Sequence, residues 1–167
     1  FAVNGEISLN GGQMEITEPL RILGNAARIL TINGNGTSRL FTIADDDDET
    51  LMPVEISGIT LMRGNGTGGE DDDGRGGAIK TFENLTMNEV IFSENGANGG
   101  GGAVFVGGGR FTLSRSLVTA NSAQGDGGGG LLLNIAGDAT DAPAPRATVV
   151  DSTFFQNSVS GEDAEGG

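Results

Sequence analysis

The amino-acid sequence contains no cysteine, histidine, tryptophan or tyrosine. Without cysteine the chain cannot form a disulfide framework or a thiolate metal site, and without histidine it cannot form a nucleophilic triad or a zinc site. The usual general base is missing together with histidine, and the aromatic platforms on which sugars stack are missing together with tryptophan and tyrosine. These absences argue against an enzyme, and we expect no catalytic residues.

Basic residues are also scarce, because 9 Lys and Arg residues stand against 23 Asp and Glu residues and leave a net charge of −14. This charge repels phosphate groups, so nucleic acid and anionic membrane surfaces are not expected partners. No apolar run approaches the roughly 20 residues of a membrane span, and we expect no signal peptide within these residues. The chain begins with Phe1 rather than methionine, so we expect that its natural start has been removed.

Glycine is abundant, at 31 of 167 residues. A glycine content this high is also found in disordered chains, but those lack apolar blocks that can bury surface when they stack. Here the glycine runs 99–102 and 127–130 each lead directly into a short aliphatic segment, 103–106 and 131–133. We therefore expect a folded chain.

Two signals recur in a fixed order, which indicates internal repeats. The first is a glycine pair followed by a small or aliphatic residue and an aliphatic run; it occurs as Gly76-Gly77-Ala78-Ile79, as Gly101-Gly102-Ala103-Val104 and, loosely, as Gly129-Gly130-Leu131-Leu132. The second is an apolar residue with asparagine three positions later; it occurs as Phe92–Asn95, Val118–Asn121 and Phe154–Asn157, with Met62–Asn65 as a weaker copy.

Short strands are predicted between these signals, because apolar residues alternate there, as in Leu85-Thr86-Met87 and Phe111-Thr112-Leu113. No amphipathic helical stretch is present to cover a flat parallel sheet, which excludes βαβ architecture. The sequence therefore predicts an all-β fold, a right-handed parallel β-helix of about five to six rungs with three short strands per rung. We expect residues 1–167 to form a single segment of such a coil.

The recurring asparagines are chemically suited to the corners of the coil. Asparagine tolerates the left-handed backbone region, and its amide can bond to the equivalent amide one rung away. The alternative is that each asparagine is a lone turn residue. We predict a structural ladder that consists of Asn65, Asn95, Asn121 and Asn157.

The end of the chain resembles the opening of another rung, because a polar stretch, 158–165, leads to Gly166-Gly167. A β-helix that stopped there would expose an unpaired edge. We therefore expect that the natural protein continues, or that the chain associates with itself by end-to-end or edge stacking.

The order of the two signals resembles the repeat of polymorphic outer-membrane proteins, in which Gly-Gly-Ala-Ile is followed by Phe-x-x-Asn. The longer pattern from Leu20-Arg21-Ile22-Leu23-Gly24 to Ile56–Leu61 is similar to secreted bacterial and archaeal right-handed β-helix repeat proteins, many of them anchored to the cell surface. This resemblance covers nearly the whole chain and implies an extracellular or cell-surface adhesin, surface-layer or filament component. Other proteins with a similar fold are polysaccharide lyases and hydrolases.

Two acidic runs, 45–49 and 70–73, depart from that pattern and lie in loops between predicted strands. Ca²⁺ binds six to eight oxygens, so loops that project from the same side could share one ion. Neither run has EF-hand spacing or a Gly-Gly-x-Gly-x-Asp repeat, and the alternative is a solvated loop kept soluble by its charge. The candidate calcium ligands are Asp45, Asp46, Asp47, Asp48, Asp71, Asp72 and Asp73, and no other cofactor is expected.

The leading hypothesis is a non-enzymatic extracellular structural protein, either a segment of a surface adhesin or a filament-forming subunit. The alternative is a polysaccharide-active lyase or hydrolase, or a carbohydrate-binding β-helix with a glycan or cell-surface partner; Arg75 beside Asp73 superficially suits a calcium-dependent lyase. Sequons at Asn35, Asn65 and Asn84 are possible glycosylation sites in a host that glycosylates secreted proteins.

Overall fold

The computed structural model describes residues 4–45, 47, 50–67, 74–125, 127–134 and 147–161. Within these residues every regular element is a β-strand, and every strand pair is parallel. The described residues contain no helix that is long and apolar enough to cross a bilayer.

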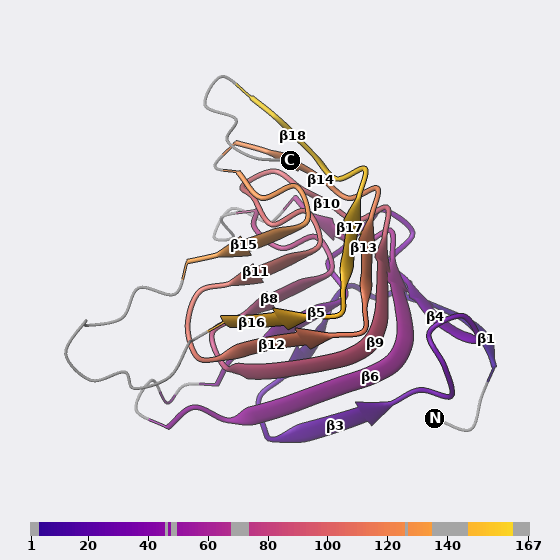
Figure 1. The fold of residues 1–167 in the computed structure, drawn as a ribbon, viewed down its shortest axis with the longest axis vertical. Helices are drawn as coiled ribbons and strands as arrows, with labels where there is room; N and C mark the ends of the chain where they lie inside the picture. The colour runs from indigo at the N-terminus through magenta and orange to yellow at the C-terminus, as the bar shows by residue number, and fades with distance from the viewer. Residues whose placement is uncertain are drawn as a thin grey trace.

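The strands form three sheets that surround one core (Figure 1). Sheet A bends into two arms, and its strands β6 (Pro53–Met62) and β9 (Asn84–Ser93) run through both of them. Arm 1 also holds β3 (Leu20–Leu23), β12 (Phe111–Ser114) and β16 (Ala147–Val150). Arm 2 also holds β1 (Gly5–Ser8), β4 (Leu30–Asn33), β13 (Leu117–Thr119) and β17 (Thr153–Phe155).

The two remaining sheets are straight stacks with strands of two or three residues. Sheet B consists of β2 (Met14–Ile16), β5 (Phe41–Ile43), β8 (Ile79–Thr81), β11 (Val104–Val106) and β15 (Leu131–Leu133). Sheet C consists of β7 (Asn65–Gly66), β10 (Gly96–Ala97), β14 (Ser122–Gln124) and β18 (Ser158–Ser160).

From β5 onward the chain passes from sheet B through arm 1 and arm 2 to sheet C, and then returns to sheet B one strand further along; in the first turn β4 of arm 2 is followed by β5 of sheet B. Sheet B contains five strands, one for each turn of the coil. The turn β8–β9–β10 has the three strands that the sequence predicts, whereas in the next turn the long strand is divided at the bend into β12 and β13. This arrangement is a parallel β-helix, and the predicted fold class is confirmed.

The core is a set of apolar columns that run across the rungs. Leu61, Phe92 and Val118 occupy equivalent positions in successive turns, and all three are fully buried. Phe154 continues this column, but it is 45% exposed because it lies in the outermost described rung. Burial of each inward side chain therefore depends on the rung above it as well as the rung below it.

One expected core alignment is shifted by a single residue. The loose repeat at Gly129-Gly130 places Leu132 in the column of Ile79 and Val104, but the structure pairs Val104 with Leu131, and Leu132 with Phe105. Both glycine runs hold four residues, but Gly129 lies beside Gly102, so that the last glycine of the later run, Gly130, takes the position of Ala103. A shift of one residue moves a strand side chain to the opposite face, so Leu131 rather than Leu132 is the inward residue.

Non-glycine residues in the left-handed region make the bends of the coil. Between the arms these are Glu89, Arg115 and Asp151, with φ of 54°, 47° and 49°. Before sheet C they include Arg63 and Glu94, with φ of 49° and 57°. The charged side chains pair between adjacent rungs, since Arg115 Nε lies 3.1 Å from Glu89 Oε1 and Arg63 Nε lies 3.1 Å from Glu94 Oε2. Such exposed pairs each contribute about 0–1 kcal/mol.

Each position of the glycine pair before sheet B requires glycine for a different physical reason. The first glycine of each pair, Gly76 and Gly101, has φ of +71° and +63°, a conformation that side chains disfavour. The second glycine, Gly77 and Gly102, lies against the backbone of the next rung: a Cβ on Gly102 would be 2.0 Å from the carbonyl oxygen of Gly129. The recurring pair is therefore required by backbone contact between rungs.

Replacement of Gly102 by alanine is expected to destabilise the fold by about 3 kcal/mol or more, because the added methyl group overlaps backbone that cannot move without separating two rungs. Gly96→Ala is the matched control, since its Cβ would meet no atom closer than Ser122 Oγ at 3.5 Å. We expect the control to change the free energy of unfolding by less than about 1 kcal/mol. Urea unfolding of both variants is the measurement, and equal losses would contradict this account of the glycine pair.

Candidate functional site

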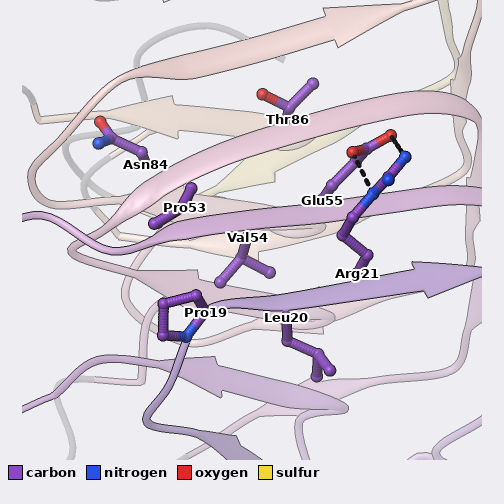
Figure 2. Close-up of a pocket in the computed structure, with 8 residues that line it drawn as sticks. All are labelled: Pro19, Leu20, Arg21, Pro53, Val54, Glu55, Asn84 and Thr86. Atoms are coloured by element: carbon purple, nitrogen blue, oxygen red, sulfur yellow. Dashed lines mark hydrogen bonds and ion pairs between the residues drawn. The ribbon is translucent and has the colours of Figure 1, made fainter.

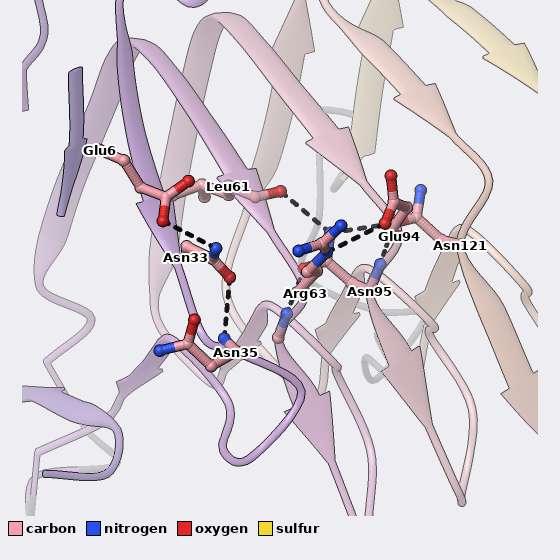
Figure 3. Close-up of polar contacts among 9 residues, drawn as sticks. Glu6, Asn33, Asn35, Leu61, Arg63, Glu94, Asn95 and Asn121 are labelled. Carbon is pink, nitrogen blue, oxygen red and sulfur yellow. Dashed lines mark hydrogen bonds and ion pairs between the residues drawn. The ribbon is translucent and has the colours of Figure 1, made fainter. Parts of the chain in front are cut away.

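Three of the predicted ladder residues, Asn95, Asn121 and Asn157, form a column of side-chain amides at the bend before sheet C. Figure 3 shows the first two. Nδ2 of Asn95 donates to Oδ1 of Asn121 at 2.9 Å, and Nδ2 of Asn121 donates to Oδ1 of Asn157 at 2.9 Å. The backbone N–H groups of Asn95 and Asn121 donate to the same oxygens at 3.0 and 3.1 Å. Each accepting oxygen therefore receives two hydrogen bonds from one neighbouring residue.

The second amide hydrogen of each asparagine bonds back to a carbonyl of the preceding rung. For Asn95 the acceptor is the oxygen of Leu61 at 3.1 Å, and for Asn121 it is the oxygen of Phe92 at 3.3 Å. Asn121 is 0% exposed. Both of its amide donors and its amide oxygen are satisfied by protein groups, so no bonding capacity is left for a ligand. The arrangement is suited to holding rungs together.

Asn65 does not belong to this column, which corrects the predicted ladder. Gly64 occupies the equivalent position, and its N–H donates to Oδ1 of Asn95 at 2.8 Å. Asn65 lies one residue further on, opposite Gly96 in sheet C, and its Nδ2 donates to the oxygen of Gly36 at 2.8 Å. The reason is that Leu61, and not Met62, is the inward residue of this rung.

A smaller amide cluster lies nearer the start of the coil, and the sequence analysis missed it. Nδ2 of Asn33 donates to Oε1 of Glu6 at 3.0 Å, and Oδ1 of Asn33 accepts from the N–H of Asn35 at 2.8 Å (Figure 3). Asn33 is buried. Its position at the end of the alternating strand β4 was a signal that could have identified it.

The acidic runs are only partly described by the structure. The N–H of Asp47 donates to Oδ1 of Asp45 at 2.9 Å, which is a local turn contact. The other five candidate ligands, Asp46, Asp48, Asp71, Asp72 and Asp73, lie outside the described residues. Among the residues that the structure describes, no three acidic side chains are grouped closely enough to hold a metal ion. Calcium binding by these loops stays a prediction.

The three sequon asparagines differ in how far their amides are engaged. Asn35 is exposed, whereas Asn65 and Asn84 are half-buried. Asn84 accepts from the N–H of Arg110 at 2.9 Å and donates to the oxygen of Leu51 at 3.3 Å. Nδ2 of Asn35 also donates, to the oxygen of Leu9 at 3.2 Å. Glycosylation at these positions stays a prediction.

Arg75, which the lyase alternative pairs with Asp73, lies near an aromatic ring. Its Cζ is 5.1 Å from the ring centroid of Phe105. Asp73 lies outside the described residues, so the structure does not place this pair.

A pocket of about 420 Å³ opens on the outer face of arm 1, where three neighbouring strands begin (Figure 2). Arg21 and Glu55 form an ion pair at its rim, with Nε and Oε2 2.8 Å apart. The residues that line it are Pro19, Leu20, Arg21, Pro53, Val54, Glu55, Asn84 and Thr86. The sequence analysis missed this pocket, although a proline immediately before each of two paired strand segments was a visible signal.

A second, more polar hollow lies over sheet C. Its lining includes Asn65, Glu94, Gly96, Asn98 and Gln124. Glu94 is already paired with Arg63. The hollow therefore offers mainly amide and hydroxyl groups.

The described structure defines a class: a parallel β-helix repeat domain held together by apolar columns and a buried amide column. In sequence the chain is 38% identical over 96 residues to a protein described as "Probable autotransporter YfaL" from Escherichia coli (strain K12). The match covers 53% of this chain but only 8% of that protein. No family model and no solved structure matches the chain. The resemblance to polymorphic outer-membrane repeats is not confirmed by these comparisons.

Asn121→Ala is expected to lower the free energy of unfolding by about 3 kcal/mol, because it leaves buried donors and acceptors of two rungs without partners. Asn65→Ala removes an amide outside the column and should cost about 1 kcal/mol or less. Chemical denaturation of the two variants tests the column directly. If Asn65→Ala lowered the free energy of unfolding as much as Asn121→Ala, the proposed stabilisation by the amide column would be contradicted.

Proposed function

We propose that this chain is a non-enzymatic structural segment of a cell-surface protein, in which the coil forms a rod that presents its loops and outer faces. The observation that carries the proposal is the uninterrupted stacking of rungs through Leu61, Phe92 and Val118 beside the amide column. In a solenoid each repeat contacts its neighbours, so such a unit extends simply by adding rungs of about 4.8 Å.

The similarity to an autotransporter supports a location at the cell surface or outer membrane. The chain matches only 8% of that much longer protein, which favours a segment of an adhesin-like rod over a free filament subunit. A filament subunit is therefore the less favoured version of the same structural proposal.

The chemistry of the arm 1 pocket supports the non-enzymatic part of the proposal. Glycoside hydrolysis ordinarily uses two carboxyl groups, about 5–9.5 Å apart. Among the described residues that line the pocket, Glu55 is the one carboxylate, and it is paired with Arg21. The pocket is thus suited to binding, and it favours a carbohydrate-binding β-helix as a second candidate function.

Antibodies raised against residues 1–167 are expected to label intact cells of the source organism, because a surface rod is accessible without lysis. External protease should remove the signal while a cytoplasmic control protein survives. Labelling that appears only after lysis would overturn the surface location.

The purified chain is expected to release no reducing or unsaturated ends from neutral or acidic polysaccharides, with or without calcium. Electron microscopy of the same material should show short particles rather than fibres. Catalytic release would overturn the non-enzymatic proposal, and regular fibres would favour the filament version.

A further inference from the structure

The outer face of arm 1 carries a regular arrangement of side chains that the rod itself does not need. Strand register places Arg21, Glu55 and Thr86 in one column that crosses three rungs. The same column continues through Thr112 and Thr148. The pocket lies at the start of this column, so a hollow leads directly into a row of hydroxyl groups.

The pocket combines an apolar wall with polar groups of both hydrogen-bonding types. Pro19 and Pro53, which precede the register pair Leu20 and Val54, supply C–H surface. The amide of Asn84 and the hydroxyl of Thr86 can both donate and accept hydrogen bonds. Small-molecule sites typically have this composition, and they have volumes of about 300–1,000 Å³.

The ion pair gives the pocket charged hydrogen-bonding groups without a net charge. Nη2 of Arg21 lies 3.4 Å from Oε1 of Glu55, in addition to the shorter contact through Nε. The side chains are still 67% and 37% exposed, so further guanidinium hydrogens and carboxylate lone pairs face solvent. A ligand with several hydroxyl groups can therefore bond to both members of the pair.

The net charge of −14 restricts the class of ligand further, because it repels an anionic polymer. Sugars present C–H faces and hydroxyl groups together, which matches the proline wall and the polar rim. We propose that this pocket binds one sugar unit of a neutral glycan, and that the next units lie along the threonine column. This inference rests on the carbohydrate-binding candidate above and is independent of the rod.

The test is a titration of isotope-labelled chain 1–167, followed through its backbone amide NMR signals. The probes are cellotetraose, maltotetraose and tetra-N-acetylchitotetraose, with tetragalacturonate as the anionic comparison. We expect at least one neutral probe to shift signals of residues 20–21, 54–55 and 84–86, with weak affinity because the pocket is open and lacks an aromatic platform. Tetragalacturonate should shift none of them.

Three variants locate the binding groups. Glu55→Gln should weaken binding of the neutral probe about tenfold, since a charge-assisted hydrogen bond is lost. Arg115→Gln is the matched control: it removes a similar Arg–Glu pair between rungs, at a bend outside the pocket, and should leave the affinity unchanged. Thr112→Val should weaken binding of the tetrasaccharide but not of the corresponding monosaccharide.

Absence of shifts with every neutral probe, shifts over sheet C alone, or equal binding of tetragalacturonate would overturn the inference. An affinity that is unchanged in Glu55→Gln would also overturn it. Surface labelling of cells is a separate measurement, so failure of sugar binding leaves the structural proposal standing.

Discussion

The structure depends on parallel pairing of each strand with its own equivalent one turn away. This constraint requires each position of a rung to meet a residue of compatible chemistry above and below it. Apolar side chains satisfy the requirement by stacking, as Leu61, Phe92 and Val118 do. A column of identical buried polar side chains satisfies it only when each side chain both donates and accepts. Asparagine has this property, because one amide carries two donors and an acceptor, whereas aspartate or serine could not make the same set of bonds.

The same constraint leaves two parts of the molecule free to vary. One is the length of chain between rungs: 26 residues separate Asn95 from Asn121, but 36 separate Asn121 from Asn157. Most of the added residues fall between β15 and β16, since Leu131 follows its partner Val104 by 27 residues and Ala147 follows its partner Phe111 by 36. The other free part is the outer face of each sheet, where Arg21 and Glu55 replace the hydroxyl groups of later rungs. Presentation of loops at the cell surface and binding of a sugar on arm 1 therefore both use positions that stacking does not restrict.

Repeat spacing was sufficient to predict the fold class, the number of rungs and most of the core, because the period of the signals directly reflects the turns of the coil. Repeat spacing was insufficient where the repeat signal and the strand register of a rung are offset by one residue. Gly64 holds the position predicted for Asn65, and Leu131 holds the one predicted for Leu132, because a single-residue slip exchanges the two faces of a strand. The arm 1 pocket could not be read from spacing at all. Arg21 and Glu55 are 34 residues apart, and only the register of β3 on β6 brings them together.

The amide column also has a direction. One Nδ2–H of Asn95 and one of Asn121 donate to the next asparagine along the chain, and each Oδ1 accepts from the preceding rung. The aligned amide dipoles therefore add, as peptide dipoles do in a helix, and each bond polarises its neighbours. The negative pole ends at Oδ1 of Asn95, where the backbone N–H of Gly64 neutralises it. The solenoid thus has an electrical polarity along its axis, so its two ends are unlike in field as well as in shape.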